Sequence, residues 1–230
     1  WVVTEPDDIA KITQGFDRVK VIYIADGHHR TAAASRIAEA RKASNPNHTG
    51  EEPYNFFLIV SFPESEVQIL DYNRVVKDLN GLSEAEFIEL IRADFIVEEV
   101  DKSAKPTVRN TFGMYLADKW YSLALNNPAP SGGSPVDRLD ISLLTTRLLE
   151  PVLGIGDPRL DPRIDFVGGI RGMIELEKRV DSGEWAVAFA LFPTSIIELM
   201  SVADAKEIMP PKSTWFEPKL ADGMISLMLD

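Results

Sequence analysis

Residues 21–34 read VIYIADGHHRTAAA, and this stretch is the strongest indication of the fold. The apolar, β-branched run before Asp26 predicts a strand, Asp26-Gly27 predicts a tight turn, and the alanine-rich run that follows predicts a helix. The first backbone N–H groups of a helix have no partners within it, so they favour an anion. Three side chains that can donate to phosphate stand at this point, namely His28, His29 and Arg30. The stretch therefore predicts a site for a phosphorylated ligand.

Each residue of the turn suits that chemistry. Gly27 lets the backbone approach a ligand and accepts unusual dihedral angles. Arg30 presents a planar fork that fits two phosphate oxygens, and His28 and His29 are donors when charged. Asp26 can hold Mg²⁺ or accept a proton from a hydroxyl group. The alternative is a plain turn in which Asp26 caps the helix, and the residues alone favour the two interpretations equally.

Composition limits the classes of protein that the chain can represent. Its 230 residues are 45% hydrophobic, which predicts a packed core rather than disorder. The longest apolar runs are too short to span a bilayer, so no membrane partner is expected. The net charge of -12 argues against general nucleic-acid binding. The chain has no cysteine, which excludes disulfides and thiolate chemistry and fits a cytoplasmic protein.

Hydrophobic periodicity predicts alternating helices and strands. Helices are expected at 5–16, 30–43, 84–91, 140–153, 171–180 and 196–205. Strands are expected at 20–25, 55–62, 67–72, 95–100, 111–117, 120–125, 163–167, 185–192 and 224–229. The stretch 126–135 is rich in Pro, Gly, Ser and Asn, and it is typical of a mobile loop. The fold class is therefore a mixed α/β protein.

Residues 25–34 resemble the signature of the ParB–sulfiredoxin superfamily. Sulfiredoxins carry Gly-Cys-His-Arg at this turn and ParB proteins carry Gly-Glu-Arg-Arg. Gly27 stands at the glycine of the motif, His28 at the sulfiredoxin cysteine, and His29 and Arg30 at the phosphate-binding pair. The sequence most resembles a bacterial domain-of-unknown-function family that has the motif Asp-Gly-His-His-Arg at this turn and includes relatives of free serine kinase. The segments LEPVLGIGD, DPRIDFVGGIRG, GEWAVAFALFPT and MPPKSTWFEPK look like the C-terminal half of that family.

The resemblance implies a fold, an activity and a set of site residues. It implies a ParB/sulfiredoxin-like nucleotide-binding core with a C-terminal α/β extension. Residues 1–125 would form the phosphate-binding segment, 126–137 a flexible loop, and 138–230 an α/β segment that packs on the same core. The implied activity is phosphoryl transfer from ATP or ADP, with Mg²⁺, to a small hydroxyl compound such as serine. The implied catalytic residues are Asp26, which would also hold the metal, and His28; the implied nucleotide-binding residues are Gly27, His29, Arg30, Thr31, Lys212, Ser213 and Thr214.

Two features depart from the family pattern. A His-Glu-x-Thr-Arg motif that precedes this region in the family is not found in the chain, which starts at Trp1 without an initiator methionine. We therefore expect the sequence to be a piece of a longer polypeptide. If the catalytic glutamate lies in that motif, this piece cannot be a competent enzyme alone. In addition, Asn73 stands where the family has a histidine.

Three weaker candidates remain. Residues 209–216 read MPPKSTWF, in which Lys212, Ser213 and Thr214 can donate to phosphate, whereas a core-anchored proline turn is the equally favoured alternative. The Gly168-Gly169 turn repeats the strand–glycine–helix pattern, and we favour a tightly packed turn there over a site that uses Arg171. Ser195 begins a helix without a His-Asp partner in view, so we interpret it as a cap.

Three functions are compatible with these observations. The first is a nucleotide-dependent small-molecule kinase, which acts mainly by positioning and by neutralising charge. The second is a non-catalytic ParB-like nucleotide-binding regulator. The third is a structural part whose glycine turn only packs against another segment.

Overall fold

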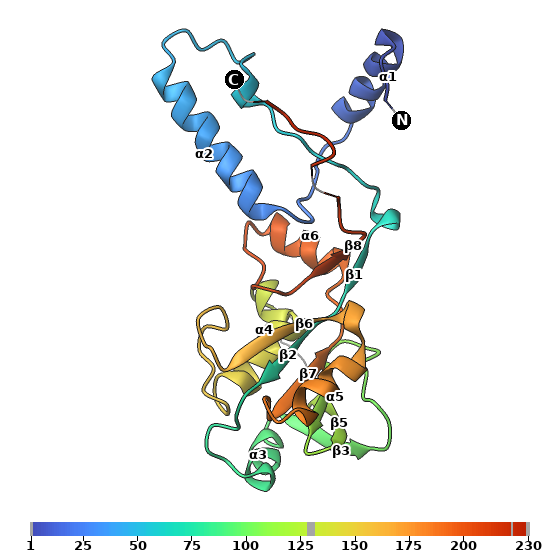
Figure 1. The fold of residues 1–230 in the computed structure, drawn as a ribbon, viewed down its shortest axis with the longest axis vertical. Coiled ribbons are helices and arrows are strands. Elements are labelled where there is room, and N and C mark those ends of the chain that lie inside the picture. Colours follow the sequence, from blue (N-terminus) through green and yellow to red (C-terminus); the bar gives the residue numbers. More distant parts are fainter. Residues whose placement is uncertain (1, 128–131, 222, 229–230) are drawn as a thin grey trace. The chain divides into compact units, whose positions relative to one another are not determined.

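The computed structural model describes residues 2–127, 132–221 and 223–228. The chain divides into two compact units. The first comprises Trp1–Val60 and Ala221–Asp230, and the second comprises Ser61–Leu220. Figure 1 shows both units and labels most of their helices and strands.

The second unit is built on a six-stranded antiparallel sheet (Figure 1). Its strand order is β3-β5-β4-β7-β2-β6. The bounds are Tyr72–Val76 (β2), Phe95–Val100 (β3), Thr111–Leu116 (β4), Lys119–Leu125 (β5), Ile164–Gly168 (β6) and Val187–Leu191 (β7). A two-stranded antiparallel sheet joins β1 (Gln68–Leu70) to β8 (Trp215–Glu217).

Both faces of the six-stranded sheet are buried. Side chains alternate between two hydrophobic clusters, as the period of two in a strand requires: Phe189 lies in one cluster, and Ala188 and Ala190 lie in the other. The larger cluster includes side chains of α3 (Glu84–Ile91), α4 (Asp140–Leu144) and the π-helical turn Thr145–Leu149. The smaller cluster includes Leu176 of α5 (Met173–Asp181). A sheet covered on both faces explains why β7 is a continuous apolar run.

Local sequence signals predict most of this unit correctly. The predicted helix at 84–91 and strand at 95–100 match α3 and β3, and the predicted strands at 111–117 and 120–125 form the antiparallel pair β4 and β5. A capping box at Ser83 begins α3, and a second one at Ser195 begins α6 (Ile196–Asp204). The interpretation of Ser195 as a cap is therefore confirmed.

The first unit contains two longer helices, α1 (Pro6–Asp17) and α2 (His28–Ser44), and the short 3₁₀ turn Pro53–Asn55. The predicted strands at 20–25 and 55–62 are wrong, because neither segment pairs with a strand in the structure. Extended apolar residues form a strand only where a neighbouring segment supplies partners for their backbone hydrogen bonds. Side chains in both segments remain about half exposed, including Ile22 at 56% and Ile59 at 53%.

Three other predictions need correction. The predicted strand at 67–72 is interrupted at Asp71, so that β1 and β2 belong to different sheets. No strand forms at residues 224–228, and the strand near the end of the chain is β8 instead. The predicted helix at 140–153 is α-helical only to Leu144 and continues as the π-helical turn.

The mixed α/β class is confirmed, with α-helices and antiparallel strands in the described residues. No helix among those residues is long and apolar enough to cross a membrane. The predicted loop at 126–135 falls partly on residues 128–131, which lie outside the described residues. The division of the chain into segments 1–125 and 138–230 remains a prediction.

Candidate functional site

The predicted phosphate turn opens helix α2 in the first unit. Gly27 is the N-cap residue, with φ +86° and ψ +22°, which is the left-handed conformation that glycine adopts at little cost. The N-cap residue makes no side-chain cap hydrogen bond, and the first turn carries no acidic residue. The positive end of the helix dipole lies at this turn and favours an anion.

The side chains at the turn are close to its backbone. The backbone N–H of Gly27 donates to Asp26 Oδ1 at 2.7 Å, and the Thr31 hydroxyl donates to the Gly27 carbonyl at 3.2 Å. A Cβ atom placed on Gly27 would lie 3.4 Å from Nε and from Nη2 of Arg30. The guanidinium group thus lies over the glycine. A planar cation is therefore placed next to the N-terminus of the helix. His28, His29 and Arg30 are all exposed.

The same turn offers one carboxylate to a metal. Mg²⁺ in nucleotide sites keeps several waters and takes one or two carboxylates together with phosphate oxygens. Asp26 is the carboxylate of this turn that would serve as such a ligand. In the part of the chain that the structure describes, no group of three or more His, Asp or Glu side chains forms a metal cluster.

The second predicted phosphate site is the loop 209–214 in the second unit. Ser213 is 8% exposed, and its carbonyl accepts a hydrogen bond from the Thr194 hydroxyl at 3.1 Å. Lys212 is exposed and has φ +53°, a left-handed conformation that is uncommon for a residue with a side chain. Its Nζ atom lies 5.7 Å from the centre of the Tyr72 ring. The loop therefore places an ammonium group beside a partly exposed aromatic side chain.

Arg74 of β2 lies beneath this loop, and the sequence analysis did not identify it. It is 2% exposed, and its Nη2 atom donates to the carbonyls of Lys212 at 2.8 Å and Pro211 at 3.4 Å. Its Nη1 atom donates to the Tyr72 carbonyl. Burial lowers the pKa of Arg74 to about 9, so the group remains a cation at neutral pH. The sequence contains one indication of this buried arginine, namely that a charged residue lies inside the predominantly uncharged run 69–76.

An aromatic cluster surrounds the Arg74 guanidinium. Its Cζ atom lies 5.0 Å from the centre of the Phe166 ring and 5.9 Å from that of Tyr72. Trp215 is edge-on to Tyr72 at 5.5 Å. Aromatic faces attract cations, so these contacts offset part of the cost of burying the charge.

The Gly168-Gly169 turn is tightly packed, as predicted. A Cβ atom on Gly168 would lie 2.5 Å from the Trp215 ring, and one on Gly169 would lie 2.4 Å from Asp71 Oδ1. Arg171 is exposed and pairs with Glu175 at 3.4 Å. Asp71 itself is buried and accepts a hydrogen bond from Asn73 Nδ2 at 2.6 Å. The glycines therefore serve packing at this position.

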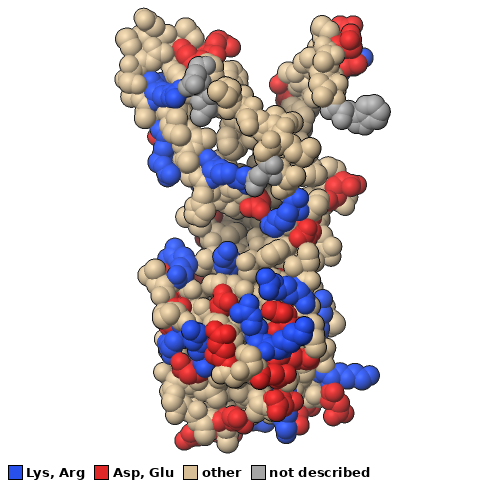
Figure 2. Space-filling model, in the orientation of Figure 1, with Lys and Arg blue, Asp and Glu red and all other residues tan. Residues whose placement is uncertain are grey.

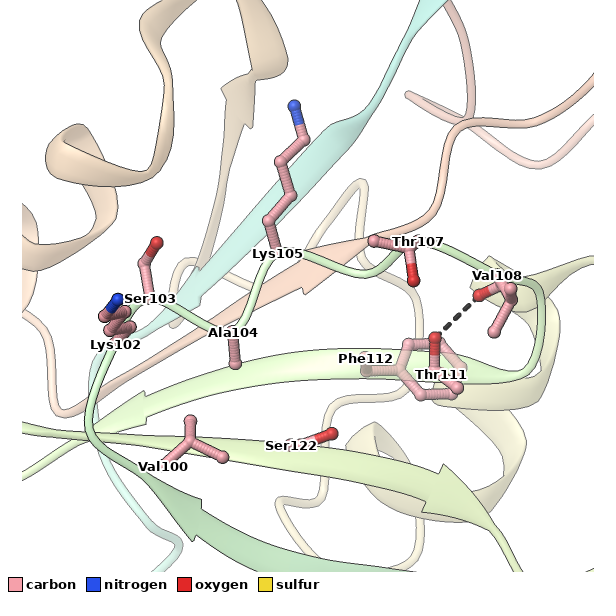
Figure 3. A pocket seen from close by; sticks show the side chains of 10 residues that line it. All are labelled: Val100, Lys102, Ser103, Ala104, Lys105, Thr107, Val108, Thr111, Phe112 and Ser122. Carbon is pink, nitrogen blue, oxygen red and sulfur yellow. Dashed lines mark hydrogen bonds between the residues drawn. The ribbon is translucent and has the colours of Figure 1, made fainter.

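A pocket of about 310 Å³ lies elsewhere in the second unit, between the β3–β4 loop and strands β4 and β5 (Figure 3). It contains no residue that the sequence analysis selected. The Lys105 side chain extends away from the strands in Figure 3, so its ammonium group does not point at the floor of the pocket. The lining residues are Val100, Lys102, Ser103, Ala104, Lys105, Thr107, Val108, Thr111, Phe112 and Ser122.

The visible surface of the second unit carries charges of both signs. Figure 2 shows Lys and Arg side chains interspersed with Asp and Glu. Several of these are ion pairs, including Arg179 with Asp165 at 3.2 Å and Arg163 with Asp161 at 3.0 Å. A site for an anion on such a surface has to be local, since the chain as a whole is acidic.

Comparisons with known proteins give one family and several distant structural likenesses. Residues 1–142 match the model of the family described as "Protein of unknown function (DUF1015)". No curated protein matches the sequence. A glutamate-to-alanine mutant of free serine kinase in complex with AMP is similar over 81% of this chain and 80% of its own, with 13% identity and a TM-score of 0.41.

Two further solved structures are similar to this chain to the same low extent. The complex of the same mutant with ADP has 13% identity and a TM-score of 0.40, and the similarity covers 81% of this chain and 80% of that one. A conserved hypothetical protein from Pyrococcus furiosus has 15% identity and a TM-score of 0.41, over 84% of this chain and 68% of that one.

Proposed function

Because this chain belongs to the DUF1015 family of proteins of unknown function, we propose an activity for it from its own residues: nucleotide-dependent phosphoryl transfer to a small hydroxyl compound. The observation that carries the proposal is the start of α2. A left-handed glycine, the N-terminus of a 17-residue helix and three consecutive donor side chains coincide there. This combination suits the phosphate groups of ATP or ADP.

The residues of the turn have distinct roles in this proposal. His29, Arg30 and the first backbone N–H groups of α2 bind the phosphates, and the Thr31 hydroxyl holds the Gly27 carbonyl within the turn. Asp26 accepts the proton of the acceptor hydroxyl, or holds Mg²⁺ against the phosphates. His28 contacts the transferring group. When bound, Mg²⁺ would supply positive charge to the phosphate oxygens.

The reaction balances with these groups alone. The acceptor oxygen forms a bond to the terminal phosphorus, and the bond from that phosphorus to the leaving nucleotide oxygen breaks. The hydroxyl proton passes to Asp26. Serine is the acceptor that the family resemblance implies. Positioning and charge neutralisation supply most of the rate enhancement in such reactions.

Calorimetric titration of the chain with ADP tests the proposal. We expect Arg30→Ala to weaken ADP binding about tenfold, because it removes a charge-assisted contact to phosphate. The matched control is Arg36→Ala, which removes an exposed arginine further along the same helix and should leave the affinity unchanged. A chain that does not bind ADP, or two variants with equal effects, would contradict the proposal.

Turnover is tested separately by ³¹P NMR on the longer polypeptide that contains this chain, with ATP or ADP, Mg²⁺ and serine. We expect phosphoserine to form, and Asp26→Asn to slow its formation while ADP binding is retained. Binding without phosphoserine formation in the complete polypeptide would instead support the non-catalytic nucleotide-binding regulator.

A further inference from the structure

The pocket of Figure 3 lies under the loop that joins β3 to β4. A Cβ atom on Gly113 would collide with the carbonyl oxygen of Ala104, so the glycine lets this loop lie directly on the sheet. Ser122 of β5 pairs with Gly113 and therefore faces the same side of the sheet. At the end of the loop, the Thr111 hydroxyl donates to the Val108 carbonyl at 2.6 Å. These contacts hold the loop over a space of about 310 Å³.

The side chains around this pocket are donors without partners. None of its described lining residues is acidic, although the chain has 36 acidic and 24 basic residues. Lys102 and Lys105 make no ion pair with another described residue. The hydroxyl groups of Ser103, Thr107 and Ser122 likewise make no hydrogen bond within the described part of the chain. The pocket therefore offers positive charge and hydroxyl groups in a chain that is acidic as a whole.

The loop backbone adds further polar groups. Among the described residues, no hydrogen bond involves the backbone of residues 102–107. Packing holds this segment instead, since Pro106 is buried and Ala104 packs against the smaller hydrophobic cluster. Val100 and Phe112 add apolar wall. Apolar walls with a few polar groups are typical of small-molecule sites, and this volume is at the lower end of their range.

We propose that this pocket binds a small polyhydroxylated carboxylate, of the size of a six-carbon sugar acid. Lys102 would bind the carboxylate, and Lys105 would add positive charge from the same loop. Ser122 and Thr107 would pair with ligand hydroxyl groups, because a hydroxyl side chain both donates and accepts. The carbon-bound hydrogens of the ligand would lie against Val100. An ammonium group suits a carboxylate, and the lining contributes no opposing negative charge.

The inference does not rest on the proposed phosphoryl transfer. The pocket belongs to the second unit, whereas the Gly27 turn belongs to the first. A sugar acid has a carboxylate but no phosphoryl group, so its binding can be measured without a nucleotide. Arg30→Ala, which tests the turn, should leave the affinity for a sugar acid unchanged.

Calorimetric titration of the complete 230-residue chain at low ionic strength tests the ligand class. Sodium gluconate is the probe, and two matched compounds each lack one of its features. Glucose has the hydroxyl groups without the charge, and hexanoate has the charge without the hydroxyl groups. We expect gluconate to bind, and both other compounds to bind at least tenfold more weakly.

Variants of the chain test the location. Lys102→Ala should weaken gluconate binding about tenfold, whereas Lys178→Ala, which removes an exposed lysine of α5 outside the pocket, should have no effect. Ser122→Ala should weaken gluconate binding about fivefold and leave that of hexanoate unchanged, since only gluconate can pair with the hydroxyl group. Thermal midpoints of the two lysine variants should equal that of the unmodified chain, which separates recognition from stability.

Amide NMR spectra provide an independent readout of the site. We expect gluconate to shift the signals of residues 102–108 and of Ser122. The proposal is overturned if gluconate does not bind, if glucose or hexanoate binds as well, or if Lys102→Ala and Lys178→Ala have equal effects. Gluconate binding that is lost in Arg30→Ala would place the carboxylate at the Gly27 turn, which would refute the pocket and leave the proposed function standing.

Discussion

Asp140 is a carboxylate that is buried at the start of α4. It is 8% exposed, and both of its oxygens accept from the backbone N–H of Asn110, at 3.0 and 3.2 Å. The pKa of Asp140 is raised to about 6, chiefly by burial; the Asn110 hydrogen bonds oppose the shift, and the charge of Glu198 adds to it. Glu198 in turn pairs with Arg109 at 2.7 Å.

The sign of the effect on stability follows from proton binding. Between pH 4 and pH 6 the folded protein holds a proton on Asp140 that the unfolded chain has lost. This residue therefore lowers the free energy of unfolding as pH rises through that window. Its contribution is complete above the folded pKa of about 6 and absent below the unfolded value of 3.8.

We predict that Asp140→Asn removes this penalty. The amide oxygen can still accept from Asn110, and no charge is buried. Relative to the unmodified chain, the variant should gain about 3 kcal/mol at most between pH 4 and pH 7. Urea denaturation across this range measures the difference, and parallel curves for the two proteins would contradict the prediction.

At the scale of the element, strand β4 depends on a glycine. Gly113 faces the loop that joins β3 to β4, and a Cβ atom there would lie 2.0 Å from the backbone carbonyl oxygen of Ala104. A backbone atom cannot move aside as the end of a flexible side chain can. The missing side chain thus lets the loop pack directly on the sheet.

We predict that Gly113→Ala lowers the free energy of unfolding by about 3 kcal/mol, because the loop must lift from the sheet. The matched control is Gly156→Ala, where an added Cβ meets nothing within 4 Å and φ is not in the left-handed region. Thermal denaturation of both variants measures the effect. An equal loss of stability in the two would show that the close approach is unimportant.

At the scale of the molecule, the two units differ in burial. The second unit contains every buried hydrophobic side chain that the structure records. In the first unit no described residue is buried, and α2 has no buried face. A 17-residue helix with no buried residue is marginally stable in water.

We predict that hydrogen exchange separates the units. Amides of α2 should exchange nearly as fast as an unfolded chain, whereas those of β2, β4 and β7 should be protected close to the global stability. Exchange measured by mass spectrometry on matched peptides tests this, and ADP should slow exchange at the start of α2. Equal protection in the two units would refute the prediction.

Local sequence determined the elements that local interactions stabilise. The capping boxes at Ser83 and Ser195 lie within four residues of chain, and the turn at Ala117-Asp118, with φ of +49° and +61°, joins adjacent strands. Gly27 likewise marks the start of α2 because only its own backbone conformation is involved. These features were predictable, since every interacting group is near in sequence.

Tertiary structure decided the strand pairing and the hydrogen bonds that join segments remote in the sequence. Residues 20–25 and 55–62 have strand-forming sequences, but no neighbouring strand pairs with them. Trp215 became part of β8 because it pairs with Leu70, and Arg74 lies beneath a loop 137 residues or more away. Hydrogen bonds between remote segments leave no periodic trace in either segment. The environment of the buried arginine in β2 is therefore known only when the carbonyl groups that accept its hydrogen bonds are known.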